Sequence, residues 1–274
     1  MSGYPNKPHI LLTNDDGLGK SEGLKSLYLS LSKRFTVTVV APFYEQSGKS
    51  QSITILSPIF IDKINNDKKG VDYIYAVKGT PTDCVKIAFS YILKRLPDFV
   101  VSGINLGANV GLDVFYSGTV AAAIESSFWG VTSFAVSVEK HTHQKKKLDL
   151  RKISQIAGKV IRSLIKTNPP RGSIFNINIP SNTSSIKGIK YTRQDLRLIK
   201  DNFIKGIDPR GRHYYWMTSG HRTISPTDSP DDKFLSDIMT LKSGYISITP
   251  LKANFTNDTF LTNHPQINPG LFIR

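Results

Sequence analysis

The sequence predicts a Rossmann-like α/β protein, in which a doubly wound, mostly parallel sheet is followed by a β-rich C-terminal extension. Through residues 9–180, short apolar segments rich in β-branched residues alternate with segments whose apolar residues recur at helical spacing. After residue 181 the alternation stops, and strand-like pieces are separated by Asn, Asp, Pro and Ser. We therefore expect an α/β core over residues 1–180, and an extension over residues 181–274 that serves in oligomerisation.

Each expected element follows from its local pattern. The segment SEGLKSLYLSLSK repeats leucines and a tyrosine at spacings of three and four, which places them on one helix face. Thr80-Pro81 ahead of Asp83 supplies an N-cap, a first-turn proline and a first-turn acid for a later helix. In chain order the expected elements are strand 9–13, helix 21–33, strand 35–42, strand 73–77, helix 82–95, strand 99–103, helix 120–130, strand 133–138, helix 149–166 and strand 173–180.

The composition is that of an ordinary globular protein. Of 274 residues, 39% are hydrophobic and 21% are charged. No apolar run approaches the roughly 20 residues that span a membrane, and residues 1–9 hold no apolar signal segment. The single cysteine cannot form an internal disulfide, which fits a reducing compartment. We expect a cytoplasmic protein without membrane association.

The net charge of +15 favours anionic partners such as nucleotides, nucleic acid or polyphosphate. The basic residues are scattered along the chain, and the densest run, at 145–147, lies in a polar stretch with the pattern of a loop. Scattered charge is also what a lysine-rich genome or selection for solubility produces. We therefore expect no dedicated nucleic-acid-binding surface.

Polar, acceptor-rich loops follow three of the expected strands. In an open α/β sheet the ligand crevice lies at the carboxyl ends of the strands, so these loops should converge on one edge. They are Asn14-Asp15-Asp16-Gly17, EQSGKSQS over 45–52, and SGINLGANVGLDVFYSGT over 102–119, which holds Asn105, Asn109, Asp113, Ser117 and Thr119.

The residue types in these loops point to a metal ion beside a phosphate group. Adjacent Asp15 and Asp16 repel each other, and a bound cation would relieve that repulsion. Carboxylate, amide and hydroxyl oxygens suit Mg²⁺ or Mn²⁺, whereas the sequence lacks the Cys/His cluster that a structural zinc site would need. The Ser-Gly-Thr turn at 117–119 leads into an Ala-rich helix, whose N-terminal N–H groups and dipole can hold phosphate. Together, the expected cation ligands and the phosphate-binding turn indicate an enzyme that acts on phosphoryl groups.

Each motif also has a purely structural interpretation. Paired aspartates before glycine often form a turn or an N-cap, a Ser-Gly-Thr turn often only caps a helix, and asparagines around a glycine often occupy left-handed turns. We expect Cys84 to be a buried packing thiol. His141 and His143 are expected in a solvated loop. Tyr214, Tyr215 and Trp216 are expected to pack in a core or between subunits, or alternatively to stack on a base.

The motifs resemble those of the SurE family, the stationary-phase survival protein nucleotidases. The resemblance covers most of the chain and rests on ILLTNDDG, VVAPFYEQSGKSQSIT, KGTPTDCV, PDFVVSGINLGANVGLDVFYSGTVAAAIES and GYISITPL. It implies hydrolysis of nucleoside 5′- and 3′-monophosphates, with polyphosphate shortened by some members. It also implies homodimers or homotetramers, held partly by exchanged C-terminal segments.

By position, the resemblance implies one divalent metal ion per subunit, Mg²⁺ or Mn²⁺, with a nucleoside monophosphate as the substrate partner. The chain departs from the family pattern at the late Thr-Asp pair, where it has Ser236 and Asp237, followed by Met239 and no histidine, and at Asn254, where an acid is common. The implied metal ligands are Asp15, Asp16, Ser47 and Asn105, and the positions near the substrate phosphate are Asn109, Ser117, Gly118 and Thr119.

The expected mechanism is metal-assisted attack of water on phosphorus. A transient aspartyl-phosphate is the alternative, and water is favoured because the DxDG[TV] spacing of aspartyl-phosphate phosphatases is absent. Asp15 and Asp16 are the expected catalytic residues, and we expect Asp15 in preference to Asp16 to move a proton. Two other classes of protein share part of the pattern: a receiver-type signalling domain that binds Mg²⁺ through paired acids, and a nucleic-acid-binding protein that uses the net charge. Neither explains three acceptor-rich strand ends.

Overall fold

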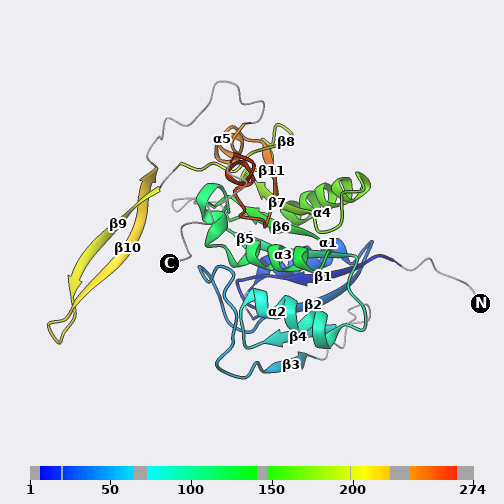
Figure 1. The fold of residues 1–274 in the computed structure, drawn as a ribbon, viewed down its shortest axis with the longest axis horizontal. Coiled ribbons are helices and arrows are strands. Elements are labelled where there is room, and N and C mark those ends of the chain that lie inside the picture. Colours follow the sequence, from blue (N-terminus) through cyan, green and yellow to red (C-terminus); the bar gives the residue numbers. More distant parts are fainter. Residues whose placement is uncertain are drawn as a thin grey trace, which may run out of the picture.

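The computed structural model describes residues 7–19, 21–64, 73–140, 147–197, 199–222 and 235–263. A nine-stranded sheet runs through the molecule in the order β3-β4-β2-β1-β5-β6-β7-β11-β8, and β9 and β10 form a separate ribbon (Figure 1). The strands are β1 His9–Thr13, β2 Thr36–Pro42, β3 Ile61–Ile64, β4 Tyr73–Val77, β5 Phe99–Leu106, β6 Thr132–Val138, β7 Ile174–Ile179, β8 Ile189–Tyr191, β9 Ile199–Ile207, β10 His213–Arg222 and β11 Ile246–Leu251. The helical segments are α1 Glu22–Leu31, α2 Pro81–Ile87, η1 Ala88–Ile92, η2 Gly111–Phe115, α3 Gly118–Phe128, α4 Leu150–Lys166, α5 Asp237–Lys242 and α6 Asp258–Asn263.

The six central strands, β4, β2, β1, β5, β6 and β7, are all parallel. From β1 the chain builds outward through β2 and β4, and it then returns to place β5 on the other side of β1. The order of strands reverses between β1 and β5, and this switch point is where an open α/β sheet forms its ligand crevice. The doubly wound, mostly parallel sheet is therefore confirmed.

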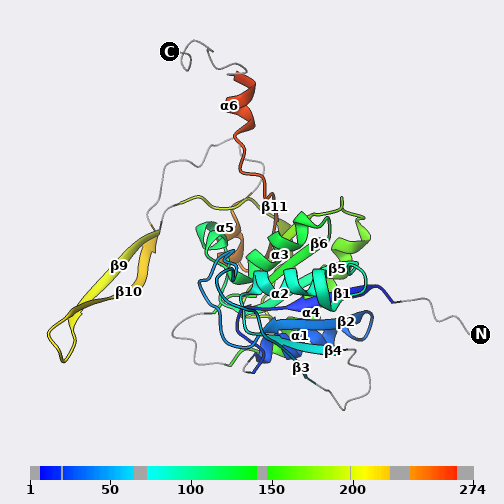
Figure 2. The same ribbon diagram turned by 60° about the horizontal axis from the view of Figure 1, so that its bottom comes forward.

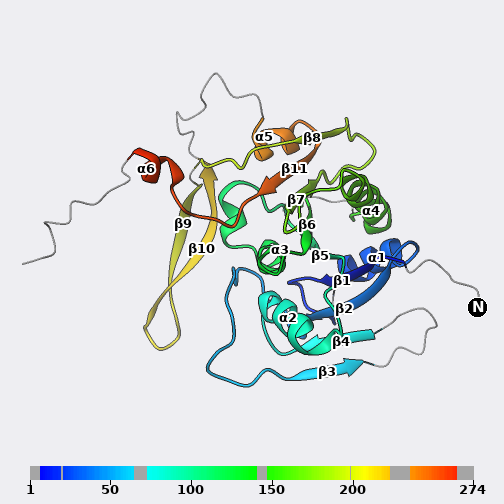
Figure 3. The same cartoon turned by 45° about the vertical axis from the view of Figure 1, so that its right-hand side comes forward.

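Helices cover both faces of the sheet, and two apolar clusters bind them to it (Figure 3). On one face, buried side chains of α1 and α4 such as Leu27 and Ile161 pack on the strands. On the other face the strands contact Val85 of α2 and Ala122 of α3. Cys84 lies in this second cluster with no solvent exposure, and burial raises the pKa of its thiol. The expected packing role of Cys84 is confirmed.

The expected helices exist, but some boundaries differ. Helix 82–95 is an α-helix over Pro81–Ile87 that continues as one π-helical segment to Ile92, and the chain is extended at Leu93. Thr80 caps it with a capping box in which Asp83 accepts the Thr80 N–H. Helix α3 begins at Gly118, two residues earlier than expected, because Ser117 accepts the N–H of Val120 as the N-cap.

The extension after residue 181 contributes to the sheet as well as to the surface. Strand β11 pairs antiparallel with β7, and β8 pairs with β11, so the sheet continues across the expected boundary at residue 180. The boundary itself stays a prediction. Two short helices that the sequence did not predict, α5 and α6, also lie here, and α6 stands away from the sheet (Figure 2).

The β9–β10 hairpin projects from the body of the molecule as a two-stranded arm (Figure 1). Tyr214, Tyr215 and Trp216 lie on β10 with exposed fractions of 44%, 61% and 68%. They are therefore not core residues of this chain, and packing between subunits stays a prediction. His141, His143 and most of the lysine run at 145–147 lie outside the described residues. Among the helices described, none combines the length and apolar character needed to cross a membrane.

Candidate active site

A cavity of about 580 Å³ opens at the carboxyl ends of β1, β2 and β5, where the three acceptor-rich loops meet. The expected convergence of these loops on one edge of the sheet is therefore present in the structure. The cavity is lined by Asp15, Asp16, Ser21, Glu22, Glu45, Ser47, Gly48, Asn105, Leu106, Ala108, Asn109, Asp113, Tyr116, Ser117 and Lys140.

The turn at Gly17 brings the first two loops together. Gly17 has a φ of +82°, and a Cβ atom there would lie 2.8 Å from the backbone carbonyl carbon of Tyr44. Glycine is the residue that satisfies both the left-handed conformation and the close approach. The backbone N–H of Gln46 then donates to the carbonyl oxygen of Asp15 over 2.7 Å. This contact holds the loop of Ser47 against the paired aspartates.

Asp15 is 4% exposed, and its carboxylate is held by the start of helix α3. Its Oδ1 accepts the hydroxyl of Thr119 over 2.6 Å, and its Oδ2 accepts the backbone N–H of Thr119 over 3.2 Å. Burial raises the pKa of Asp15 above its ordinary value, and the hydrogen bonds from Thr119 act against that shift. A carboxylate fixed in this way projects into the cavity with little freedom to rotate.

Thr119 therefore has a different contact from the one expected. It is fully buried and does not line the cavity, and its hydroxyl and N–H both donate to Asp15. In this arrangement Thr119 positions Asp15 and does not face a substrate phosphate. Nothing in the motif SGT itself distinguishes the two roles, because the choice depends on where β1 ends relative to α3.

Asp16 is the more accessible carboxylate of the pair. Burial, the adjacent charge of Asp15 and the charge of Glu45 raise the pKa of Asp16 to about 6, while Lys140 acts in the opposite direction. The cavity also contains Glu22 and Asp113. Burial and neighbouring negative charge raise the pKa values of Asp15 and Asp16, and both favour binding of a cation.

Ser47 and Asn105 complete a set of oxygen donors around the cavity. The hydroxyl of Ser47 donates to Oε1 of Glu45 over 2.8 Å, and its oxygen keeps lone pairs that can coordinate a cation. The amide nitrogen of Asn105 donates to the carbonyl oxygen of Gly107 over 2.8 Å, which leaves Oδ1 as the atom able to coordinate. Both side chains therefore present oxygen to the same space as Asp15 and Asp16.

Asn109 is held by two asparagines of β7 that the sequence analysis missed. Its N–H donates to Oδ1 of Asn178 over 2.8 Å, and its carbonyl oxygen accepts the amides of Asn176 and Asn178 over 2.7 and 3.1 Å. Its own Nδ2 donates to the hydroxyl of Ser137 over 2.9 Å. A signal was present in the segment IFNINI, where two asparagines two residues apart share one face of an otherwise apolar strand.

Ser117, the N-cap of α3, lines the cavity, whereas Gly118, the first residue of the helix, is buried and is not part of the lining. Ser117 accepts the N–H of Val120, so its own hydroxyl hydrogen stays available to a ligand. A Cβ atom on Gly118 would lie 3.0 Å from Cβ of Asp15 and 3.1 Å from Cγ of Pro81, so the helix start approaches the paired aspartates closely. Among the expected phosphate ligands, Asn109 and Ser117 line the cavity.

The donor set fits a hard divalent cation. Two carboxylates, one amide oxygen and one hydroxyl oxygen match the preferences of Mg²⁺ and Mn²⁺. Among the described residues, no group of three or more His, Cys, Asp or Glu side chains lies close enough together to hold a metal ion. A cation at this cavity would therefore depend on Ser47 and Asn105 as well as on the two aspartates.

Fold and cavity together define a class: a Rossmann-like α/β protein with an acidic, oxygen-lined site beside a helix N-terminus. Comparisons with known proteins make the class specific. A family model described as Survival protein SurE matches residues 10–201. The chain is 39% identical to the 5′-nucleotidase SurE of Syntrophobacter fumaroxidans, over 90% of this chain and 94% of the relative. It is 40% identical to the 5′-nucleotidase SurE of Thermosipho africanus, over 92% and 94% of the two chains.

A solved structure agrees with the sequence comparisons. The crystal structure of the SurE protein from Aquifex aeolicus matches with a TM-score of 0.76 at 34% identity, over 93% of this chain and 98% of that one. The chain belongs to the SurE family. The family expected from the sequence motifs is therefore confirmed.

Proposed function

We propose that this protein is a divalent-metal-dependent phosphatase that hydrolyses nucleoside 5′-monophosphates. One observation carries the proposal: the paired aspartates, Ser47 and Asn105 line the same cavity as Ser117 at the start of α3. The relatives from Syntrophobacter fumaroxidans and Thermosipho africanus bear the name 5′-nucleotidase, which supports the same reaction. Activity on nucleoside 3′-monophosphates and on short polyphosphate is included in the proposal as a further substrate range.

One Mg²⁺ or Mn²⁺ ion per subunit would be held by Asp15, Asp16, Ser47 and Asn105. When bound, such an ion offsets negative charge on phosphoryl oxygens and lowers the pKa of a coordinated water. The raised pKa values of Asp15 and Asp16 support this assignment, because a bound cation stabilises the ionised form of both carboxylates.

The substrate phosphate would be bound by donors from the opposite wall of the cavity. Asn109 uses one hydrogen of its amide for Ser137 and keeps the other for a phosphate oxygen. The Ser117 hydroxyl and the N–H of Gly118 at the first turn of α3 would add two more donors. These fixed donors would stabilise the charge that develops on the phosphoryl group as the ester bond breaks.

Proton transfer is assigned to a carboxylate oxygen of Asp16. The sequence favoured Asp15 for this step, but Asp15 already accepts two hydrogen bonds from Thr119 and is almost fully buried. Asp16 has the larger access to the cavity, so it can take a proton from the attacking water and pass it to the nucleoside oxygen that leaves as the P–O bond breaks.

The deciding experiment measures phosphate release from a panel of nucleoside 5′- and 3′-monophosphates and short polyphosphate with Mn²⁺, Mg²⁺ or EDTA. We expect release that depends on metal and stops in EDTA. Asp15→Asn and Asp16→Asn should each lower kcat at least about 100-fold, the scale of losing a charged positioning group.

Asp62→Asn serves as the matched control, because Asp62 is an exposed acid on edge strand β3 outside the cavity. It should retain wild-type activity. Absence of release with every metal would contradict the proposed reaction, and full activity of both active-site variants in metal-replete buffer would contradict the metal assignment.

We also infer that the protein forms a homodimer or homotetramer. The β9–β10 arm exposes large apolar side chains on both strands, among them Phe203 and Ile204 on β9 and Trp216 and Met217 on β10, each at least 60% exposed. An isolated two-stranded ribbon of this kind is marginally stable in water, and a second copy of the chain would cover its apolar surface.

A further inference from the structure

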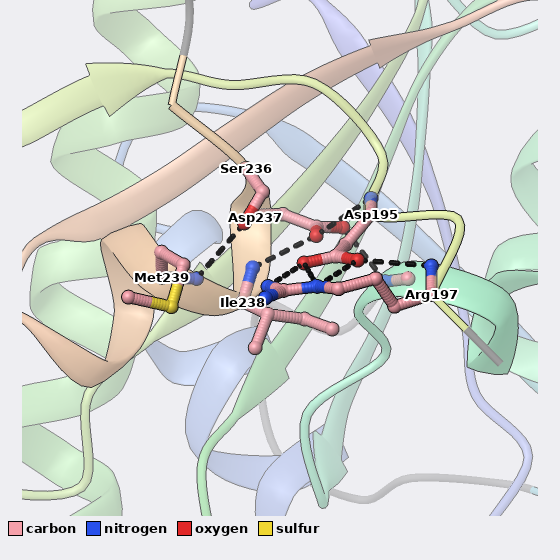
Figure 4. A network of polar contacts seen from close by, with 7 residues as sticks. Asp195, Arg197, Ser236, Asp237, Ile238 and Met239 are labelled. Carbon is pink, nitrogen blue, oxygen red and sulfur yellow. Dashed lines mark hydrogen bonds and ion pairs between the residues drawn. The ribbon is translucent and has the colours of Figure 1, made fainter. Parts of the chain in front are cut away.

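Asp237 joins three segments that lie far apart in the sequence. Figure 4 shows its contacts with Asp195 and with the start of α5. Its Oδ2 accepts the backbone N–H of Gly111 over 2.8 Å. Its Oδ1 accepts the N–H of Asp195 over 3.0 Å and the N–H of Ile238 over 2.8 Å. The side chain has no solvent exposure. One buried carboxylate therefore links the loop after β5, the connection between β8 and β9, and the start of α5.

A carboxylate suits this position because every contact is made to a hydrogen-bond donor. An ionised aspartate offers only acceptors, so both oxygens can serve the three N–H groups. An asparagine of the same size would replace one oxygen by an NH₂ group, which would face an N–H and leave that donor without an acceptor. The segment around Asp195 is itself fixed, because the carboxylate of Asp195 forms an ion pair with Arg197.

Gly111 is held from both sides. While Asp237 accepts its N–H, the amide of Gln194 donates to its carbonyl oxygen over 2.9 Å. Gly111 has a φ of +61°, and a Cβ atom there would lie 2.9 Å from the carbonyl oxygen of Asp195 and 3.0 Å from Cδ1 of Ile238. The backbone at Gly111 is thus specified by the segments around Asp195 and Asp237.

The loop that Gly111 belongs to forms the phosphate-side wall of the cavity. Gly111 follows Asn109 by two residues and begins the short helix η2, which leads directly to Ser117. Asn109, Asp113 and Ser117 all line the cavity, whereas Asp237 does not. The proposed metal ligands lie elsewhere, after β1 and β2 and at the end of β5.

We propose that Asp237 is a positioning residue for phosphate binding, acting through Gly111 on Asn109 and Ser117, with Gln194 in a supporting role. This inference rests on the proposed phosphatase function. Because Asp237 contacts the phosphate-side loop and no proposed metal ligand, it should affect recognition of phosphate and leave metal binding unchanged.

The test compares Asp237→Asn with the wild-type protein. We expect KM for the best nucleoside monophosphate and the inhibition constant of inorganic phosphate to rise about tenfold, the effect of displacing one hydrogen-bonding group. The dissociation constant of Mn²⁺ should stay within about twofold. Asp208→Asn is the matched control, because Asp208 also accepts two backbone N–H groups, from Arg210 and Arg212, but lies at the turn of the β9–β10 arm. It should change none of these constants.

Gln194→Leu provides a second, milder variant in case Asp237→Asn does not fold. It removes the hydrogen bond to the carbonyl oxygen of Gly111, and it should raise the same two constants by a smaller factor. A fall in kcat with unchanged KM and unchanged phosphate inhibition would show loss of folded protein, and it would overturn the positioning role.

Hydrogen exchange separates this inference from the proposed reaction. In Asp237→Asn, amides of residues 109–117 should exchange faster than in wild type, while those of residues 14–17 should not change. If wild type releases no phosphate, the proposed function fails, and the exchange result alone decides whether Asp237 holds the loop. Unchanged exchange at 109–117 would overturn the inference whatever the activity.

Discussion

Two adjacent aspartates with the same sequence context have different surroundings in the folded chain. Asp15 is buried and accepts both donors of Thr119, whereas Asp16 has the larger access to the cavity and a pKa raised to about 6. Burial acts on both, but the hydrogen bonds that partly offset it reach Asp15 from α3. The pair therefore divides into a fixed carboxylate and an accessible one, which suits the proposal that both hold a cation and that Asp16 also accepts a proton.

Replacing Thr119 by valine should weaken catalysis through Asp15. Valine has nearly the same shape but lacks the hydroxyl that donates to Oδ1 of Asp15. Loss of a hydrogen bond to a charged group should lower kcat about tenfold or more, whereas Thr119→Ser should keep most of the activity. Steady-state kinetics at saturating metal checks this. A rise in KM with unchanged kcat would instead support the phosphate contact that the sequence predicted for Thr119.

The raised pKa of Asp16 should make the stability of the metal-free protein depend on pH. The folded state binds this proton more tightly than the unfolded state, whose pKa is near the ordinary value of 3.8. The free energy of unfolding should therefore fall as pH rises from 3.8 through about 6. Above that range Mn²⁺ should restore stability, and below it the proton should compete with the metal.

Thermal unfolding in EDTA and in Mn²⁺, at about pH 5 and about pH 7.5, measures this effect. The stabilisation by Mn²⁺ should be larger at the higher pH. Asp16→Asn isolates the contribution, because the amide does not titrate. An equal response of wild type and variant to pH in EDTA would count against the assignment.

At the scale of elements, strand β7 supports the site as well as the core. Its apolar residues alternate with Asn176 and Asn178, and the side chains of these two asparagines form hydrogen bonds with the backbone of Asn109. Since β7 pairs with β6 in parallel register, Ser137 of β6 reaches the same asparagine. Strands β6 and β7 therefore together fix Asn109, which lies in the loop after β5.

Asn178→Ala should both destabilise the protein and weaken substrate binding. The N–H of Asn109 would lose its acceptor in a buried position, which costs about 1–3 kcal/mol of unfolding free energy. The released loop should raise KM. Urea unfolding and steady-state kinetics test the two effects, and Asn182→Ala, at an exposed asparagine four residues later, should show neither. Wild-type KM in a destabilised variant would limit β7 to a structural role.

At the scale of the whole molecule, the net charge of the chain is positive, whereas the charge of the cavity lining is negative. The chain carries a net charge of +15, yet the cavity is lined by Asp15, Asp16, Glu22, Glu45 and Asp113, and among the described lining residues Lys140 is the one lysine. The general positive charge can attract anionic nucleotides from a distance. Within the cavity the acids repel an anion, and the proposed cation would offset that repulsion. Net charge alone therefore does not identify the chemistry of the site.

Removing apolar side chains from the arm should change the oligomeric state. Trp216→Ser combined with Met217→Ser deletes two side chains that are 68% and 66% exposed. We expect a smaller species in light scattering coupled to size exclusion, because the arm would lose apolar surface that the proposed contact with a second copy would cover. Tyr91→Ser is the control, because Tyr91 is 79% exposed and lies on η1, outside the arm. This variant should leave the mass unchanged. An unchanged mass in the arm variant would show that other contacts hold the assembly.

The sequence by itself determined the alternation of strands and helices, the edge at which the loops meet, and the residue types of the cation site. These features depend on local periodicity, capping and turn residues such as Thr80, Ser117 and Gly17, which act within a few positions along the chain. The confirmed fold and the shared cavity follow from them. The metal, the reaction and the role of each ligand remain proposals.

Only the tertiary structure decided which partners the polar side chains find. Thr119 bonds Asp15, Asn178 bonds Asn109 and Asp237 bonds Gly111 across separations of 104, 69 and 126 residues. Tyr214, Tyr215 and Trp216 resemble core residues in sequence but lie on an exposed arm. Hydrogen-bond choice depends on the distances between elements, and those are set by packing of the whole sheet and its helices. Local pattern contains no information on such distances.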